Sequence, residues 1–271
     1  RFFKKDIYLG PCAYTTPFFL ETLNIPKNLK IGIMINAKDI VSNNLSKSEI
    51  NKNFFELSKK KKISFIRFAC HASEISKIVP LCNELNKKKI LTAINLMQIS
   101  EISDLEIEKI TKLVAQSKLD VFYFADSLGN LEPQDIIHIS KVIKKNWKKE
   151  IGFHAHDNMS RALINGVAAF NNGINWIDST VTGMGRGAGN IQTEFALLQF
   201  AKYLDKNSDI SLLLKLIEQK FNPMKAKYKW GTNPYYYLAG QYKIHPTFIQ
   251  SMLNELKLEP LEVLSAIDNL K

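Results

Sequence analysis

Two histidines separated by one residue are the side chains best placed to do chemistry. His154 and His156 end the apolar run 151–156, and Asp157 and Asn158 follow directly. Side chains alternate between the two faces of a strand, so both imidazoles would project from one face, roughly 7 Å apart. The chain has only five histidines in all. We therefore interpret the pair as part of a divalent-metal site, and two histidines of a polar interior are the alternative.

A glycine-rich segment further along the chain is the second candidate. Residues 183–190 read Gly-Met-Gly-Arg-Gly-Ala-Gly-Asn and are expected to open a helix. Glycine lets backbone approach a ligand closely, and the N-terminus of a helix favours anions. A dinucleotide-binding Gly-x-Gly-x-x-Gly motif does not fit, because its third glycine would fall on Ala188 or Asn190. We expect Gly185 and Gly187 to contact substrate; a loop with unusual backbone angles and no ligand is the alternative.

Polar residues near the ends of other apolar runs are further candidates. Asn95 lies near the end of one run, and Asp126 and Ser127 lie at the end of another. Active sites of β/α barrels lie at the carboxyl ends of the strands. We therefore expect Asn95, Asp126 and Ser127 to contact substrate, although any of them could instead cap a helix.

A regular alternation of strands and helices would position these residues. Six nearly continuous apolar runs are typical of parallel strands covered by helices; they are 30–36, 64–70, 91–97, 121–126, 151–156 and 176–181. Their spacing is close to 30 residues, the length of one strand–helix unit. The pattern predicts an α/β fold, either a barrel or an open doubly wound sheet.

Helical patterns separate the apolar runs. Ser46 with Glu49 matches a capping box. Leu163, Val167 and Phe170 recur as one stripe that we expect to be buried in a helix over 161–171.

The last part of the chain has a different pattern. From about residue 210 helical stretches continue without a convincing strand. We therefore predict a partial barrel over 1–207 and an all-helical C-terminal extension over 208–271.

Composition excludes several classes of protein. Hydrophobic residues make up 45% and charged residues 23%, and no apolar run is long enough to cross a bilayer. The three cysteines form no Cys-x-x-Cys pair. The net charge of +11 comes from lysine runs near the ends of predicted helices, where cations favour the helix dipole. We expect a cytoplasmic protein that binds neither membrane nor nucleic acid.

Two segments together carry a resemblance to a known family. Gly-Phe-His-Ala-His-Asp-Asn at 152–158 and Asp-Ser-Thr-Val-Thr-Gly-Met-Gly-Arg-Gly-Ala-Gly-Asn at 178–190 resemble the DRE-TIM metallolyases. That superfamily includes isopropylmalate synthase, hydroxymethylglutaryl-CoA lyase and 4-hydroxy-2-oxovalerate aldolase, and the last is the most similar. The resemblance implies a (β/α)8 TIM barrel.

The resemblance also implies a reaction and the residues for it. A Mn2+ or Mg2+ ion would be held by His154, His156 and an aspartate, with Asn190 as a further candidate ligand. A 4-hydroxy-2-oxo acid would be cleaved to pyruvate and an aldehyde. Tyr235 and Tyr236 are the candidates for a catalytic tyrosine. A homo-oligomer and an aldehyde dehydrogenase partner are further expectations.

The sequence departs from the family in one respect. The Asp-Arg-Glu-like motif of the first barrel strand does not occur in it. We expect a barrel that lacks its first two strands in this chain, because six strands cannot close an eight-stranded barrel. Such a fragment is expected to be a poor catalyst alone. A Claisen-type acyltransferase and a non-catalytic interaction subunit stay open as alternatives.

Overall fold

The computed structural model of the chain describes residues 13, 17–42, 63–203, 209–256 and 258–271. The capping box expected at Ser46 and Glu49 lies outside these residues. No helix within the described ranges is both long and apolar enough to cross a membrane.

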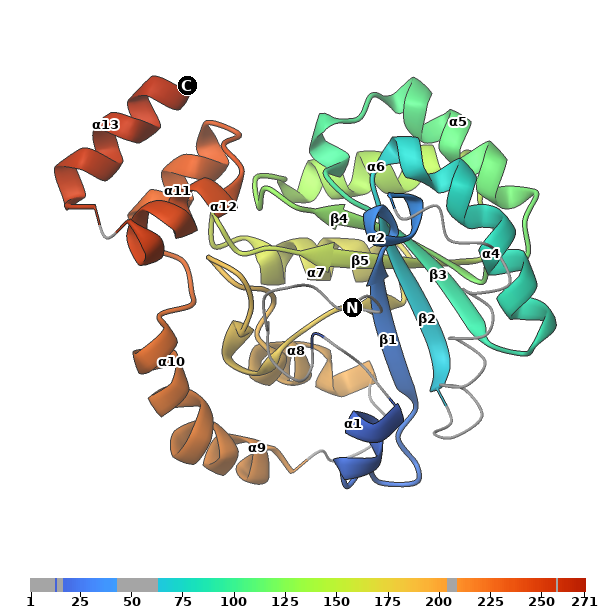
Figure 1. Cartoon of the computed structure of the whole chain (residues 1–271), viewed down its shortest axis with the longest axis horizontal. Coiled ribbons are helices and arrows are strands. Elements are labelled where there is room, and N and C mark those ends of the chain that lie inside the picture. Colours follow the sequence, from blue (N-terminus) through green and yellow to red (C-terminus); the bar gives the residue numbers. More distant parts are fainter. Residues whose placement is uncertain (1–12, 14–16, 43–62, 204–208, 257) are drawn as a thin grey trace. The chain divides into compact units, whose positions relative to one another are not determined.

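The described strands belong to one six-stranded sheet (Figure 1). They are β1 (Ile31–Asn36), β2 (Ile63–Cys70), β3 (Leu91–Leu96), β4 (Val121–Asp126), β5 (Glu150–Ala155) and β6 (Trp176–Ile177). Their order in the sheet is their order in the chain, and β1 with β2, β2 with β3, and β5 with β6 pair in parallel. The α/β class and the six strands are therefore confirmed.

The last strand is shorter than predicted. The apolar run 176–181 suggested six residues, yet β6 ends at Ile177. Thr180 instead donates its N–H to the carbonyl of Ile191 at 2.9 Å and forms an isolated bridge with Gln192. The chain thus pairs with the segment before the next helix rather than extending the sheet.

The first of two compact units comprises residues 1–97, 103–123 and 142–151. Besides β1 to β3 it holds α1 (Pro17–Thr22), α2 (Ala37–Val41), η2 (Ala72–Glu74), α4 (Ile75–Lys87) and α5 (Asp104–Ala115). Phe68 and Phe122 are fully buried, and the Phe122 ring lies 6.2 Å from that of Trp147. Ser103 caps α5 by accepting the N–H of Glu106.

The second compact unit comprises residues 98–102, 124–141 and 152–271, so that β4, β5 and α6 (Pro133–Asn146) each contribute residues to both units. Its other elements are η3 (Ile99–Glu101), α7 (Ala162–Asn171), β6, η4 (Val181–Gly183), α8 (Thr193–Phe200) and η5 (Ala201–Tyr203), followed by α9 (Ile210–Leu216), η6 (Ile217–Phe221), α10 (Asn222–Tyr228), α11 (Pro234–Gln241), α12 (Pro246–Gln250), η7 (Ser251–Glu255) and α13 (Pro260–Leu270). The predicted boundary between residues 207 and 208 stays a prediction.

Helix α7 matches the predicted range, but its predicted buried stripe is wrong. Leu163, Val167 and Phe170 are only half-buried, while the buried residues are Ala162, Asn165, Gly166 and Ala169. A Cβ on Gly166 would lie 2.9 Å from Ile191 Cδ1. Close approach of the helix therefore selects small side chains on the buried face.

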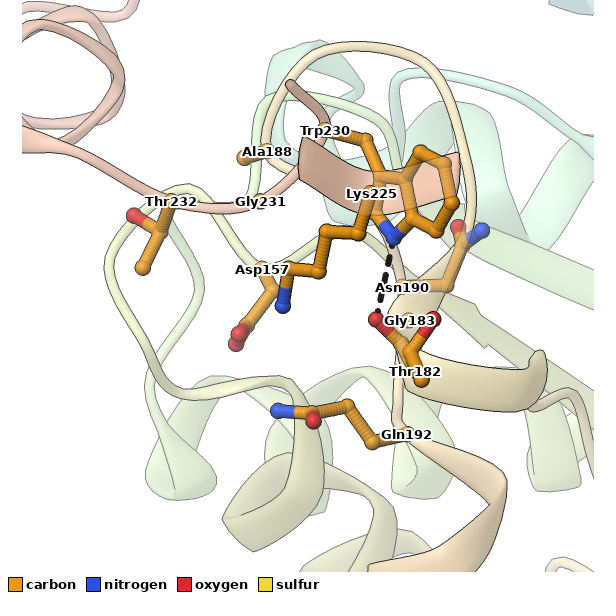
Figure 2. A pocket seen from close by; sticks show the side chains of 10 residues that line it. All are labelled: Asp157, Thr182, Gly183, Ala188, Asn190, Gln192, Lys225, Trp230, Gly231 and Thr232. Carbon is orange, nitrogen blue, oxygen red and sulfur yellow. Dashed lines mark hydrogen bonds between the residues drawn. The ribbon is translucent and has the colours of Figure 1, made fainter. Parts of the chain in front are cut away.

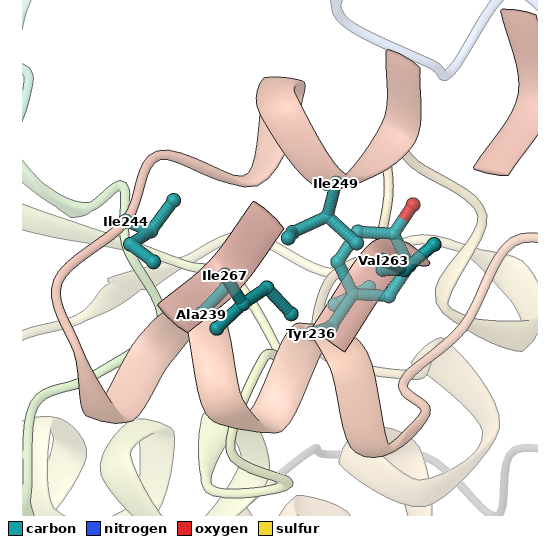
Figure 3. Packing of buried hydrophobic residues seen from close by; sticks show 7 residues of the cluster. Tyr236, Ala239, Ile244, Ile249, Val263 and Ile267 are labelled. Atoms are coloured by element: carbon teal, nitrogen blue, oxygen red, sulfur yellow. The ribbon is translucent and has the colours of Figure 1, made fainter. Parts of the chain in front are cut away.

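A small apolar core holds the last helices together (Figure 3). Tyr236 and Ala239 of α11, Ile249 of α12, and Val263 and Ile267 of α13 are all buried in it. The described residues from 209 onward are helical or loop.

Candidate functional site

The histidine pair lies in the second compact unit, at the end of β5. His154 is in the strand and His156 is the first residue after it. Their ring centroids are 5.2 Å apart and the ring planes make an angle of 80°. His154 Nδ1 lies 2.8 Å from Asp178 Oδ2. A carboxylate that accepts the Nδ1–H of an imidazole fixes the ring and leaves Nε2 available as a ligand.

His156 is held in its neutral form. Burial, followed by the charges of His154, Arg186 and His245, lowers its pKa to about 3. Its Nδ1 is buried and has no hydrogen-bond partner among the residues that the structure describes. A neutral imidazole is the form that binds a metal ion. Arg186 and His245, which were not among the predicted site residues, thus lie close enough to disfavour the charged form of His156.

The two histidines fit two positions of a metal site. In the part of the chain that the structure describes, no group of three His, Cys, Asp or Glu side chains is placed to hold a metal. Asn190 forms an antiparallel bridge with His156, which places the two Cβ atoms about 5 Å apart. Its Nδ2 donates to the carbonyl of Met184, so its amide oxygen is the end left to face a cation. The other positions would be filled by water or substrate oxygens, as Mg2+ commonly prefers.

The glycine loop is closed by backbone hydrogen bonds. Gly189 donates its N–H to Arg186 at 3.1 Å, and Asn190 donates to Gly183 at 3.1 Å. Asp157 in turn donates to the carbonyl of Gly189 at 3.0 Å, which joins the loop to the histidine motif. The expectation that the loop opens a helix directly is wrong: α8 begins only at Thr193.

Thr182, just before the loop, has a strained backbone that is held from both sides. Its φ of 54° lies in the left-handed region. Its N–H donates to the buried carboxylate of Glu194 at 3.0 Å, and its carbonyl accepts from Trp230 Nε1 at 3.1 Å. These two bonds fix the peptide groups on either side of the strained residue.

The segment 230–232 holds the loop and the histidine motif together, and we call it the C-terminal clamp. Besides the bond from Trp230, Gly231 donates its N–H to the carbonyl of Gly187 at 3.0 Å. Thr232 Oγ1 donates to the carbonyl of Asn158 at 2.8 Å. Three consecutive residues thus each donate one hydrogen bond to the site.

A cavity of about 170 Å3 lies between the clamp and the loop (Figure 2). Asp157 lines it from the histidine motif and Lys225 from α10. The remainder of the wall comes from the loop and the residues around it (Thr182, Gly183, Ala188, Asn190, Gln192) and from the clamp.

Comparison with known proteins identifies the family. The model of the HMGL-like family matches residues 50–217. The chain belongs to the HMGL-like family. The resemblance to the DRE-TIM metallolyases is thereby confirmed.

Relatives of this HMGL-like chain include several enzymes. A 4-hydroxy-2-oxovalerate aldolase of Geobacillus thermodenitrificans is 31% identical over 61% of this chain and 48% of its own length. A 4-hydroxy-2-oxovalerate aldolase of Carboxydothermus hydrogenoformans is 28% identical over 73% of this chain and 56% of its own length. Oxaloacetate decarboxylase of Mycobacterium tuberculosis is 26% identical over 68% of this chain and 52% of its own length. The chain spans about half the length of these curated relatives. The names of these relatives are those of carbon–carbon lyases.

Solved structures support the same fold. The N-terminal domain of a Bacteroides vulgatus protein described as an aldolase has a TM-score of 0.81 and 28% identity, covering 97% of this chain and 85% of that one. Hydroxymethylglutaryl-CoA lyase of Bacillus subtilis has a TM-score of 0.63 at 14% identity, and the match covers 79% of this chain and 76% of the lyase chain. The HMGL-like chain therefore has a TIM-barrel-like α/β fold.

The two tyrosines selected as catalytic candidates differ in environment. Tyr236 is buried, and its ring packs on the loop: a Cβ on Gly187, whose φ is +60°, would lie 3.0 Å from Tyr236 Cε1. Burial raises the pKa of Tyr236. Tyr235 is half-buried and packs against the helical core. The Asn233 side chain accepts the N–H groups of both.

Gly185 and Gly187 lie in the loop, where we expected substrate contacts. A Cβ on Gly185 would overlap the Asn190 side-chain amide, and one on Gly187 would press on Tyr236. Both glycines thus have packing reasons to lack a side chain. Their predicted substrate contacts stay predictions.

Asp126 and Ser127 organise loops at the end of β4. The Asp126 carboxylate accepts the N–H groups of Asn130 and Leu131 at 3.1 and 3.2 Å. Burial raises its pKa to about 7, against the opposing effect of these hydrogen bonds. Ser127 Oγ accepts the N–H of Gln98 at 2.9 Å. Each residue has a structural role, and its expected contact with substrate stays a prediction.

Asn95 belongs to the first compact unit. It is buried near the end of β3, and within the described part of the chain its Oδ1 has no hydrogen-bond partner. Its expected contact with substrate also stays a prediction.

Proposed function

We propose that the protein is a divalent-metal-dependent aldolase that cleaves a 4-hydroxy-2-oxo acid, of the 4-hydroxy-2-oxovalerate kind, to pyruvate and an aldehyde. The observation that carries the proposal is the pair of His154 and His156, with His154 oriented by Asp178. An imidazole oriented by a carboxylate, beside a second imidazole in its neutral form, suits the binding of a divalent metal ion.

The named relatives support the choice of a 2-oxo acid. One acts on 4-hydroxy-2-oxovalerate and another on oxaloacetate. Aldol cleavage of the first and decarboxylation of the second break the bond between carbons 3 and 4 of a 2-oxo acid. Both reactions leave the same three carbons, those of pyruvate, with negative charge that must be stabilised.

Each residue around the pair has a part in this proposal. A Mn2+ or Mg2+ ion held by His154 and His156, with Asn190 as a further candidate, would supply Lewis-acid stabilisation of that charge. Asp178 keeps the His154 ring in one orientation. Arg186 offers a guanidinium to the substrate carboxylate.

Tyr236 is assigned as a proton donor rather than a base. Burial raises the pKa of its hydroxyl, so the phenol keeps its proton near neutral pH. A buried phenol can protonate the three-carbon product after cleavage.

The proposal is tested by metal binding and product release. The purified protein is titrated with Mn2+, and pyruvate released from 4-hydroxy-2-oxovalerate is quantified with Mn2+ or with excess chelator. We expect release that requires metal, and both binding and release lost by at least a hundredfold in His156→Ala. His138→Ala, at an exposed position on α6, is the matched control and should behave as wild type.

Other outcomes favour the alternatives. Pyruvate release that survives the chelator refutes the metal-dependent mechanism. Consumption of an acyl-CoA with a 2-oxo acid, without aldehyde release, favours a Claisen-type acyltransferase. Absence of both metal binding and release favours an interaction subunit. The homo-oligomer and the aldehyde dehydrogenase partner stay predictions.

A further inference from the structure

The cavity behind the glycine loop contains two opposite charges that are not paired with each other. Lys225 and Asp157 both line it, yet no ion pair or hydrogen bond joins these two described residues. A group placed between them could contact both.

Lys225 differs from the other lysines of its segment. Lys215, Lys220, Lys227 and Lys229 are exposed, whereas Lys225 is half-buried. Holding a flexible ammonium-bearing chain at a cavity has an entropic cost, which a bound anionic group would offset.

The backbone of Gly231 makes room for this side chain. A Cβ on Gly231, whose φ is +122°, would lie 3.4 Å from Lys225 Cε and 3.7 Å from Nζ. The amine end of Lys225 therefore rests against the clamp.

Asp157 faces the cavity with one oxygen still available. Its Oδ1 accepts the N–H of Ala162 at 2.9 Å, where α7 begins. In Figure 2 the polar ends of Asp157, Lys225 and Gln192 point toward the same space. Asn190, which also lines the cavity, forms a bridge with His156, so the cavity adjoins the histidine pair.

We propose that this cavity, beside the histidine pair, binds a small α-amino acid. The carboxylate of the ligand would accept hydrogen bonds from Lys225 and the Gln192 amide, and its ammonium would donate to Asp157. A simple anion would be repelled by Asp157 and a simple cation by Lys225. A cavity of about 170 Å3 is roughly ten times the volume of about 15 Å3 that one water molecule needs, which leaves room for a small amino acid.

The test is direct binding, independent of catalysis. The protein is titrated with glycine, alanine, serine and threonine by calorimetry and by ligand-observed saturation-transfer NMR. Propionate and ethylamine, which carry one charge each, are titrated at the same ionic strength. We expect at least one amino acid to bind about tenfold more tightly than either single-charge compound.

Variants assign the binding to the cavity. Lys225→Met should weaken amino-acid binding about tenfold, while Lys220→Met, at an exposed lysine nearby, should leave it unchanged. Asp157→Asn retains an oxygen for Ala162 and should shift the preference toward propionate. Far-ultraviolet circular dichroism confirms that each variant is folded.

Three results would overturn the proposal: propionate binding as tightly as the best amino acid, equal affinity in wild type and Lys225→Met, or no binding by any of the four amino acids. None of these results depends on whether the protein is an aldolase.

Discussion

Replacing Gly189 by alanine should destabilise the fold more than its backbone angle alone explains. Gly189 has a φ of +81°, and an alanine in the left-handed region costs roughly 1–2 kcal/mol. The added Cβ would also overlap the carbonyl oxygen of Gly183, which belongs to the backbone and cannot turn aside. Relieving this overlap would disturb the bonds from Asn190 to Gly183 and from Asp157 to Gly189, at about 1 kcal/mol each.

The expected loss of unfolding free energy is therefore about 3–4 kcal/mol. Gly173→Ala is the matched control, because Gly173 also has a positive φ, +73°, but is exposed; it should cost only about 1–2 kcal/mol. Urea unfolding followed by circular dichroism measures both. With a slope of about 3 kcal/mol per molar, the midpoints should fall by about 1 M and about 0.5 M. Equal shifts of the urea midpoint in the two variants would show that overlap of the added Cβ with the carbonyl oxygen of Gly183 does not contribute to the loss of stability.

Two further predictions concern Trp230 and Asp126. Trp230→Phe keeps a ring but leaves the carbonyl of Thr182 without its donor, so urea unfolding should show a loss of about 1–3 kcal/mol; a change under half a kcal/mol would contradict the role of the indole N–H. The folded-state pKa of Asp126 is raised to about 7, above an unfolded value of about 3.9. The folded protein therefore holds this proton more tightly, and stability falls as pH rises from about 4 to about 7, by up to about 4 kcal/mol. Asp126→Asn removes this contribution. The urea midpoint should therefore change less between pH 4.5 and pH 7.5 in the variant than in wild type, and an equal change in both would refute the assignment.

The strands could be predicted because burial on both faces leaves an uninterrupted apolar run. All six residues of β4 are buried, which is the pattern of a parallel strand covered by helices. The histidine pair could be predicted because alternation along one strand is local. Both inferences depend on residues close together in the sequence, where the geometry of the backbone is the same in every protein.

The buried face of α7 could not be predicted in this way. Hydrophobic periodicity ranks residues by their side chains and therefore selected Leu163, Val167 and Phe170. The face that packs is chosen by how closely the helix approaches, and Gly166 lies where even a methyl group would meet Ile191. Phe170 instead packs against two aromatic rings: its ring centroid lies 5.1 Å from that of Phe200 and 4.6 Å from that of Tyr203.

The C-terminal clamp shows why the rest of the site has no sequence signature. Its three hydrogen bonds all end on backbone carbonyls, those of Thr182, Gly187 and Asn158. Every residue presents a carbonyl, so these acceptors leave no trace in the choice of side chains. Only the donors Trp230 and Thr232 depend on residue type, and they act across 48 and 74 residues of sequence. The clamp, which motif analysis passes over, therefore helps to hold the glycine loop beside the histidine pair, and substitutions in it should alter the cavity and the loop together.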